Sequence, residues 1–335
     1  RVLAGSMALS RRAKLEGHDE RVWFLSWTAD GKKLASCSGD KTVRIWMESN
    51  GSWFCEAILD DAHDRTIRSV TWSPGGDKLA TASFDGTCAI WALKDEEYEQ
   101  IATLQGHENE VKCVSWDPSG KLIATCSRDK SVWVWENVGE EDEYECVAVL
   151  HGHTQDVKMV GWHPSKEILV SASYDDSLRV WEADEDDWSA SQVLESHAST
   201  VWAFAFSSTG ERMASVSEDL TVRVWRDKKF SSSSSVLFEE ECVLRGQHTR
   251  PIYHVDWLPG SDVIVTSAGD DFIRVFSRCE EKEKEKVEWE LIAEAPAAHQ
   301  GDVNCAKWRP GGGEQRLLAS GGDDGAIVLW EFKSK

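Results

Sequence analysis

The residues best suited to chemistry are histidines and aspartates that recur at a fixed spacing. The histidines are His18, His63, His107, His153, His197, His248 and His299. The aspartates that follow them are Asp40, Asp85, Asp129, Asp175, Asp219, Asp270 and Asp324. The separation is 22 positions in six cases and 25 in the last, where Gly311–Gly313 lengthens a turn. An imidazole held by a carboxylate can activate a serine nucleophile, or it can form a strong internal hydrogen bond.

A hydroxyl and an aromatic residue accompany every His–Asp pair. The hydroxyls, four residues before the aspartates, are Ser36, Thr81, Thr125, Ser171, Ser215, Thr266 and Ser320. The aromatics, six residues after them, are Trp46, Trp91, Trp135, Trp181, Trp225, Phe276 and Trp330. An indole N–H can donate to the hydroxyl, the hydroxyl to one imidazole nitrogen, and the other nitrogen to the carboxylate. Catalysis would need one unit to differ, and no hydroxyl does, so we predict structural networks and no enzyme. Phe276 lacks an N–H, so the sixth network should be incomplete.

Residues 106–135 show which elements must hold these side chains. Gly106-His107 precedes an apolar run that ends at Trp116, and a Pro-Ser-Gly turn leads to a second run, residues 122–127. Asp129 follows in a tight turn, and a third run ends at Trp135. Period-two runs separated by turn residues predict short antiparallel strands. The same pattern recurs seven times, which indicates an array of similar units of about 45 residues.

The unit length and the Gly-His opening resemble WD40 repeats, although no closing aromatic residue is followed by Asp. The resemblance covers the whole chain and implies an all-β fold: one seven-bladed β-propeller over residues 1–335, with blades that start near the seven histidines. Each blade would be a four-stranded sheet around a central channel. The last unit has only three predicted strands, so we expect the segment before Gly17 to complete blade seven and close the ring.

Composition argues against several classes of function. The formal net charge of −22 opposes binding to nucleic acid or to an anionic membrane surface, because both need basic patches. No apolar run reaches the roughly 18 residues of a membrane-spanning helix. The nine cysteines include no Cys-x-x-Cys pair, so we expect no metal or cofactor. They suit reduced thiols of a cytoplasmic protein, with the nucleus as a second location.

Three positions per unit should project around one mouth of the channel, here called the top face: three and five residues after the histidine, and one before the aspartate. Their basic residues are Arg21, Arg68, Lys112, Arg128 and Lys158. Their aromatic residues, expected to be exposed, are Trp23, Phe84, Tyr174, Trp202 and Tyr253. Their acidic residues are Glu110, Asp156, Glu218, Asp302 and Asp323. Because aromatics and arginine are enriched at interface hot spots, we predict that this face binds a peptide with a carboxylate and an apolar or aromatic side chain.

Acidic hairpins, at residues 95–97, 140–143 and 184–187, should lie at the opposite end of the strands. We interpret them as a solvated rim.

Several stretches outside the repeat pattern resemble one family within the WD40 proteins. They are GHENEVK (106–112), ATCSRDKSVWVWE (124–136), EDEYECV (141–147), HTQDVK (153–158), WHPS (162–165) and SASYDD (171–176). They are similar to the WD40 subunit of the cytosolic iron–sulfur protein assembly (CIA) machinery. The family's functional top-face arginine falls at Arg128, with Lys112 and Lys158 as its neighbours. A Leu-Tyr-Arg tripeptide that docks a co-chaperone in some members reads Val180-Trp181-Glu182 here, so this chain departs from the family at that place.

This resemblance implies a non-catalytic adaptor of the CIA targeting complex. Such a protein works with a small α+β partner and a HEAT-repeat scaffold, and it helps deliver iron–sulfur clusters to cytosolic and nuclear apo-proteins. Some of these clients present a C-terminal tail that ends in an aromatic residue. Two alternatives stay open: another WD40 platform, such as a ubiquitin-ligase substrate receptor or a histone-tail reader, and an enzyme or metalloprotein.

Overall fold

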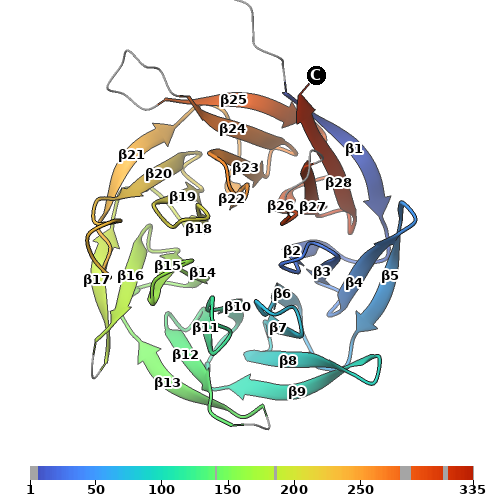
Figure 1. Cartoon of the computed structure of the whole chain (residues 1–335), viewed down its shortest axis with the longest axis horizontal. Helices are drawn as coiled ribbons and strands as arrows, with labels where there is room; N and C mark the ends of the chain where they lie inside the picture. The colour runs from blue at the N-terminus through green and yellow to red at the C-terminus, as the bar shows by residue number, and fades with distance from the viewer. Residues whose placement is uncertain (1–6, 140–141, 185–186, 280–287, 312–315, 335) are drawn as a thin grey trace, which may run out of the picture.

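The computed structural model describes residues 7–139, 142–184, 187–279, 288–311 and 316–334. These residues form seven four-stranded antiparallel sheets arranged as blades around a central channel (Figure 1). Parts of two acidic hairpins, residues 140–141 and 185–186, lie outside the described residues, as do Gly312 and Gly313. The predicted fold, an all-β seven-bladed propeller, is confirmed.

The strands of the first four blades follow one another from the channel outward. Blade one contains β2 (Val22–Trp27), β3 (Lys33–Ser38), β4 (Val43–Ser49) and β5 (Ser52–Leu59). Blade two contains β6 (Ile67–Trp72), β7 (Lys78–Ser83), β8 (Thr87–Lys94) and β9 (Glu97–Gln105). Blade three contains β10 (Val111–Trp116), β11 (Leu122–Ser127), β12 (Val132–Asn137) and β13 (Tyr144–Leu150). Blade four contains β14 (Val157–Trp162), β15 (Ile168–Ser173), β16 (Leu178–Ala183) and β17 (Trp188–Leu194).

The last three blades repeat this order, except that the outermost strand of blade seven comes from the start of the chain. Blade five contains β18 (Val201–Phe206), β19 (Arg212–Ser217), β20 (Val222–Asp227) and β21 (Phe238–Leu244). Blade six contains β22 (Ile252–Trp257), β23 (Val263–Ala268), β24 (Ile273–Cys279) and β25 (Glu288–Ala295). Blade seven contains β26 (Val303–Trp308), β27 (Arg316–Gly322), β28 (Ile327–Ser334) and β1 (Met7–Leu15).

The ring is closed by pairing between the first and last strands of the chain. β1 runs antiparallel to β28 from the pair Met7–Ser334 to the pair Leu15–Ile327, with a register shift between Arg11 and Ala13. In Figure 1 the blue β1 lies along the outside of the red β28. The prediction that the segment before Gly17 supplies this strand is confirmed. Closure matters because an unpaired strand edge is a template for aggregation.

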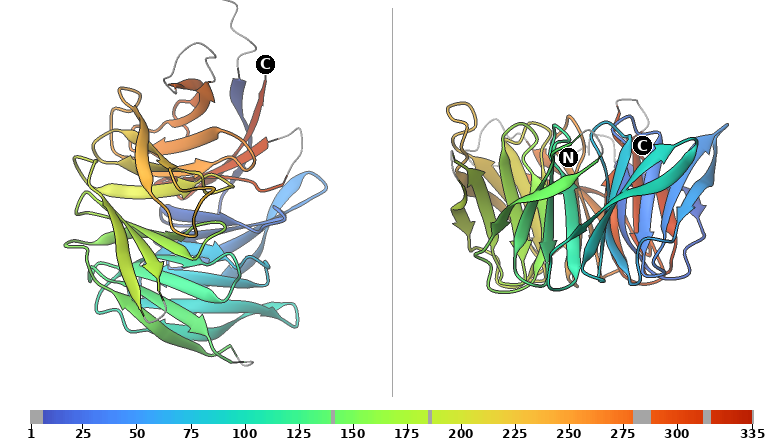
Figure 2. Two further views of the ribbon diagram at one scale, coloured as in Figure 1. Left: turned by 60° about the vertical axis from the view of Figure 1, so that its left-hand side comes forward. Right: turned by 90° about the horizontal axis from the view of Figure 1, so that it is seen from below.

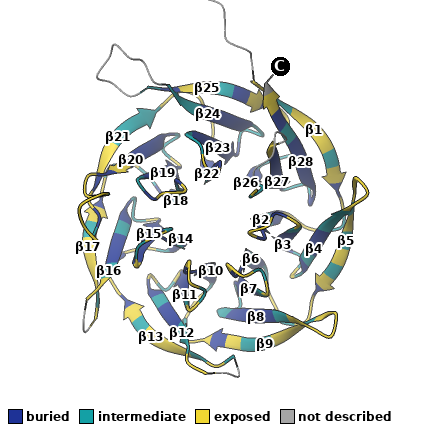
Figure 3. Ribbon diagram, in the orientation of Figure 1, coloured by how far each residue is buried: buried dark blue, intermediate teal, exposed yellow. Residues whose placement is uncertain are grey.

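The hydrophobic core is divided among the spaces between neighbouring blades. One cluster joins Ile45 of blade one to Trp72 and Trp91 of blade two, and another joins Ile90 of blade two to Trp116 of blade three. The inner strands are buried on both faces, whereas the outermost strands consist mainly of exposed and half-buried residues (Figure 3). Seen from the side, the strands run between two flat ends, so alternate loops gather at each end (Figure 2). No helix in the described part of the chain could span a membrane.

The predicted networks are present in six blades. In blade three, His107 Nδ1 donates to Asp129 at 2.7 Å, the Thr125 hydroxyl donates to His107 Nε2 at 2.8 Å, and the Trp135 indole donates to Thr125 at 2.9 Å. The same three bonds, between 2.7 and 3.3 Å, form in blades one, two, four, five and seven. The imidazole side chains of these six blades are only 0–2% exposed, and they serve as internal links between strands.

Electrostatics stabilises these networks. Burial disfavours the charged form of Asp129, but the hydrogen bonds from His107 and Ser131 outweigh it and hold the pKa of that carboxyl well below its usual range. The carboxylate of Asp129 therefore stays ionised at physiological pH. Burial also lowers the pKa of His153 and His197, which keeps those rings neutral despite their aspartate partners.

Blade six departs from the pattern in two ways. Phe276 has no N–H to offer Thr266, as the sequence predicts. In addition, one nitrogen of Arg274, Nη1, lies 2.8 Å from His248 Nδ1 and donates to both oxygens of Asp270 at 3.0 and 2.8 Å. Since Nδ1 then accepts, His248 must carry its proton on Nε2 and donate to Thr266 at 2.8 Å, the reverse of the direction in the other blades.

We expect blade six to exchange its amide hydrogens faster than blade seven, because the indole link from β24 to β23 is missing. Hydrogen–deuterium exchange with mass spectrometry compares the amide exchange rates of β23–β24 with those of β27–β28. Phe276→Trp should slow exchange in β23–β24 and leave β27–β28 unchanged. Equal protection of the two blades in the unmodified protein would show that Arg274 fully replaces the indole.

Candidate partner-binding face

Local backbone geometry brings the predicted top-face positions together. The residue before each network aspartate donates its N–H to the residue three positions after the histidine: Arg128 to Glu110 at 3.0 Å, and Tyr174 to Asp156 at 2.9 Å. The turn after Arg128 is fixed by Lys130, whose φ of 75° lies in the left-handed region, and by Asp129, which accepts from the Ser131 N–H at 2.9 Å. The side chains therefore project from short, well-braced turns at the channel mouth.

Basic and aromatic side chains on this face form cation–π pairs. Two guanidinium groups lie over the ring of Trp23, with Arg21 Cζ at 5.2 Å and Arg68 Cζ at 4.9 Å from its centroid. In the next blades Lys112 Nζ lies 4.1 Å from the centroid of Phe84. Such contacts hold both partners in place and strengthen as water is removed.

The cation–aromatic series continues across blades four to six. Lys158 Nζ lies 5.1 Å from the ring of Tyr174 and 5.2 Å from that of Trp202. Trp202 packs edge-on against Tyr253, whose hydroxyl donates to Asp302 at 2.9 Å. Tyr174 is 52% exposed, but the other four predicted aromatics are half-buried. The expectation of exposed aromatics is therefore wrong for those four, because neighbouring side chains cover their rings.

Acidic neighbours neutralise much of the predicted basic surface. Glu110 accepts from Lys112 at 2.6 Å and from Arg65 at 3.1 Å, and it lies 3.8 Å from Arg128. Elsewhere Asp156 pairs with Lys158 at 3.4 Å, and Asp323 lies 3.8 Å from Arg21. The side chain of Arg128 is 54% exposed, and among the described residues its one ion pair is the long contact with Glu110, so it can reorient toward a ligand.

Arg68 differs from these cations, because among the described residues no carboxylate pairs with it. It lines a narrow depression at the channel mouth together with Lys112, Lys158 and Asn304. Burial lowers the pKa of Arg68, and it lowers the pKa of Lys158 too, where Asp156 opposes the effect and Lys112 and Arg68 add to it. A guanidinium kept from water without a counter-ion is a strong site for an external anion.

Sequence reasoning missed two contributors to this face. Arg65 lies two residues after His63, one residue before the first expected position, and its Nη1 donates to the Phe84 carbonyl at 2.7 Å. Asn304 stands at an expected position but was not selected; its amide donates to Asp323 at 2.9 Å and to the Val22 carbonyl at 3.1 Å. Among the described residues, no group of three or more His, Cys, Asp or Glu side chains is arranged to hold a metal ion.

Comparison with known proteins places the chain in a family. The family described as WD domain, G-beta repeat matches seven segments: 9–47, 53–92, 98–136, 144–182, 188–226, 239–277 and 291–331. A probable cytosolic iron–sulfur protein assembly protein CIAO1 homolog of Nematostella vectensis is 61% identical over 325 residues, 95% of this chain and 98% of the relative. A probable cytosolic iron–sulfur protein assembly protein ciao1 of Xenopus tropicalis is 58% identical over 97% of this chain and 98% of its own length. Protein CIA1 of Arabidopsis thaliana is 50% identical over 96% of each chain. The chain therefore belongs to the WD40 family and, within it, to the family of these cytosolic iron–sulfur protein assembly proteins.

Proposed function

We propose that this protein is a non-catalytic adaptor in cytosolic iron–sulfur protein assembly, and that its top face holds proteins destined to receive clusters. The names of two relatives that are 58% and 61% identical over nearly the whole chain support a role in cytosolic iron–sulfur protein assembly. The repeated His–Asp pairs are used as internal links between strands, which supports a scaffold rather than an enzyme. The cluster is cargo for the client and needs no ligands from this chain.

The adaptor role includes partners and a location. The small α+β protein and the HEAT-repeat scaffold of the CIA targeting complex are the proposed partners, and apo iron–sulfur proteins are the proposed clients. The complex would act in the cytoplasm and also in the nucleus, because its clients occupy both compartments. The net charge of −22 supports binding to proteins rather than directly to nucleic acid or membrane.

The observation that carries the top-face proposal is the unpaired guanidinium of Arg68. A C-terminal carboxylate of a client could pair with it inside the channel mouth and accept two parallel N–H bonds. An aromatic side chain on the same tail would then pack beside Phe84 and Tyr174, of which Tyr174 is already exposed. Arg128, at the rim, would reorient to make a second contact.

Replacing either arginine should weaken client binding without unfolding the protein. Arg68→Glu should reduce affinity about 30-fold or more, which is about 2 kcal/mol, because it puts a carboxylate where the ligand needs a cation. Arg128→Glu should weaken binding less and lower the iron–sulfur enzyme activity of clients in cells. The measurement is fluorescence polarisation with a labelled C-terminal client peptide, with thermal unfolding as a check of folding.

The matched control is Lys94→Glu, which makes the same change of charge on an exposed residue at the far end of β8. It should leave peptide affinity unchanged. If Arg68→Glu and Arg128→Glu both bind the peptide like the unmodified protein, the top face is not the client site. If affinity purification recovers cullin adaptors or histones rather than iron–sulfur proteins, the adaptor role itself is wrong.

A further inference from the structure

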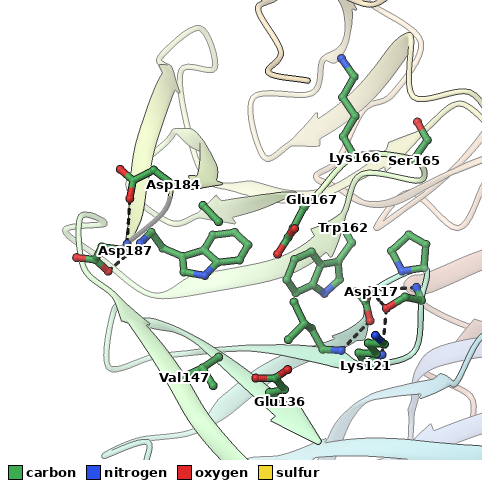
Figure 4. Close-up of a pocket in the computed structure, with 15 residues that line it drawn as sticks. Asp117, Lys121, Glu136, Val147, Trp162, Ser165, Lys166, Glu167, Asp184 and Asp187 are labelled. Carbon is green, nitrogen blue, oxygen red and sulfur yellow. Dashed lines mark hydrogen bonds between the residues drawn. The ribbon is translucent and has the colours of Figure 1, made fainter. Parts of the chain in front are cut away.

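A groove of about 650 Å³ lies between blades three and four, at the end of the ring opposite the top face (Figure 4). Its apolar lining consists of Trp162 and Trp188, whose rings meet edge-on with centroids 5.7 Å apart, together with Leu122 and Val147. Val147 is 47% exposed, so its aliphatic side chain is accessible at the groove.

Comparison with blades one and two shows what fills the equivalent junction there. Lysines stand six residues after the tryptophans that end β2 and β6, at Lys33 and Lys78. Lys33 reaches into the junction with blade two, where Nζ lies 5.4 Å from the ring of Tyr98, donates to its hydroxyl at 3.0 Å and pairs with Glu56 at 2.8 Å. Lys78 likewise pairs with Asp142 of blade three.

Blade three carries aliphatic residues at both positions of the Lys33–Glu56 pair. Leu122 stands six residues after Trp116, in the place of Lys33, and Val147 stands three residues after Tyr144, as Glu56 does after Trp53. Tyr98 lies in blade two, the blade that follows Lys33. The residue at the same position in blade four, the blade that follows Leu122, is Trp188. The junction therefore keeps its aromatic wall but lacks the cation that fills the equivalent space in blade one.

Carboxylates surround this apolar floor. Asp117, Glu136, Glu167, Asp184 and Asp187 line the groove, against Lys121 and Lys166. Lys166 is committed elsewhere, because its ammonium donates to Asp227 of blade five at 3.0 Å, and Figure 4 shows it directed away from Trp162. Among the described residues, Glu136 and Glu167 have no cation partner. An apolar floor beneath unpaired carboxylates calls for a ligand that is both cationic and aliphatic.

We propose that this groove binds a segment of a partner protein in which a lysine or arginine stands beside aliphatic residues. The cation would take the place that Lys33 fills in blade one, near the Trp188 ring and within reach of Glu136 and Glu167. The neighbouring aliphatic side chains would cover Leu122 and Val147. A second copy of this chain fits poorly, because two molecules of net charge −22 repel each other.

The acidic hairpins beside the groove gain a role from this assignment. Described residues of the hairpins that flank it, Glu143, Asp184 and Asp187, are exposed, as expected of a solvated rim. Beside an acidic groove, their charge would also steer a basic segment toward the site. The site stands apart from the top face and does not depend on the function proposed for that face.

The test places a lysine in the groove through Leu122→Lys, because lysine is the residue at the equivalent position, Lys33, in blade one. The probe is a capped synthetic peptide, Gly-Leu-Lys-Val-Lys-Gly, titrated by calorimetry into the full-length protein at low salt. The unmodified protein should bind it with a Kd below about 1 mM, and Leu122→Lys should weaken binding at least roughly tenfold. The same peptide with glutamate in place of both lysines should not bind.

Two further variants keep the result interpretable. Val193→Lys adds the same charge on the outer strand of blade four and should leave binding unchanged, which separates the groove from a general effect of net charge. The surface double variant Glu136→Gln with Glu167→Gln should weaken binding several-fold, and it gives a second reading if Leu122→Lys lowers the unfolding temperature.

Several outcomes would overturn the proposal. They are failure of the basic peptide to bind at millimolar concentration, equal binding of the acidic peptide, and unchanged binding by both Leu122→Lys and the double glutamine variant. Self-association of the unmodified protein that Leu122→Lys abolishes, seen by sedimentation, would instead assign the groove to a second copy of this chain.

Discussion

Deleting residues 1–15 should lower the unfolding temperature by roughly 10 °C or more, corresponding to the loss of at least about 4 kcal/mol. The deletion removes β1, which pairs with β28 through eight of its nine residues and buries Leu15 within the cluster that also contains Val22 and Ile327. It would also leave the edge of β28 without a neighbour, so the truncated protein should aggregate on heating. Differential scanning calorimetry measures both effects.

Deletion of residues 1–6 is the control for this experiment. It stops before Met7 and keeps every pair between β1 and β28. The shorter deletion should unfold at the same temperature as the full chain. If the protein that lacks residues 1–15 unfolds at the same temperature as the full chain, β1 contributes nothing to the stability of the ring. Pairing between β1 and β28 would then not be needed to close it.

Acidification should destabilise the protein by an amount on the order of 5 kcal/mol between pH 7 and pH 3. Burial, partly opposed by the hydrogen bond that His153 donates to Asp175, lowers the folded-state pKa of His153 below 6.5, and the same holds for His197 with Asp219. Burial lowers the pKa of His248 as well, where the positive charge of Arg274 adds to the effect and the negative charge of Asp270 opposes it. The unfolded chain therefore takes up these protons first, and stability falls as the pH drops below about 6.5.

The network aspartates act in the same direction at lower pH. Burial opposes ionisation, but the hydrogen bonds lower the pKa of Asp270 and of Asp324 to about 2, and those of the other five further. Their contribution is complete above an unfolded pKa of 3.8 and is lost as the pH falls through the folded value. Relief of self-repulsion near the pI of 4.9 opposes the histidine effect. The decline should thus be shallow above pH 5 and steep below pH 4.

Urea unfolding at a series of pH values measures this profile. Asp175→Asn should be less stable than the unmodified protein at pH 7, because His153 loses its charged acceptor. It should also show a shallower decline below pH 4, since one of the titrating carboxyls is gone. Equal free energies of unfolding at pH 7 and pH 3 would contradict the assignment of the His–Asp pairs as buried links.

The repeat pattern predicted the fold well because the same spacing of histidine, hydroxyl residue, aspartate and aromatic residue occurs in every one of the seven units. A residue that departs from the pattern in one blade, such as Phe276 in place of tryptophan, does not hide the spacing that the other six blades share. Closure by the N-terminal segment followed from counting strands, and the pairing of Leu15 with Ile327 bears it out. Position relative to a histidine was likewise enough to predict that Arg128 and Tyr174 lie at one mouth of the channel.

Side-chain partnerships were harder to predict, because they depend on distances between blades. The spacing rule could not show that Glu110 would lie close to Lys112, Arg65 and Arg128. It also could not show that no carboxylate among the described residues would pair with Arg68. Nor could it show that Arg274 would enter the sixth network, since arginine also occurs at that position as Arg44 in a blade with the ordinary bonds. The importance of Leu122 for the groove likewise becomes clear only when the structure shows that Lys33 fills the equivalent junction between blades one and two.

The pairing of β1 with β28 also dictates when the molecule can be finished during its synthesis. Leu15 and its partner Ile327 are 312 positions apart, and synthesis of the residues between them takes roughly 15–60 s at about 5–20 residues per second. Throughout that interval β1 has no partner, because β28 is the last of the described strands to be synthesised. The nascent chain must therefore carry β1 unpaired during that interval, and this is the period in which a chaperone would be needed most.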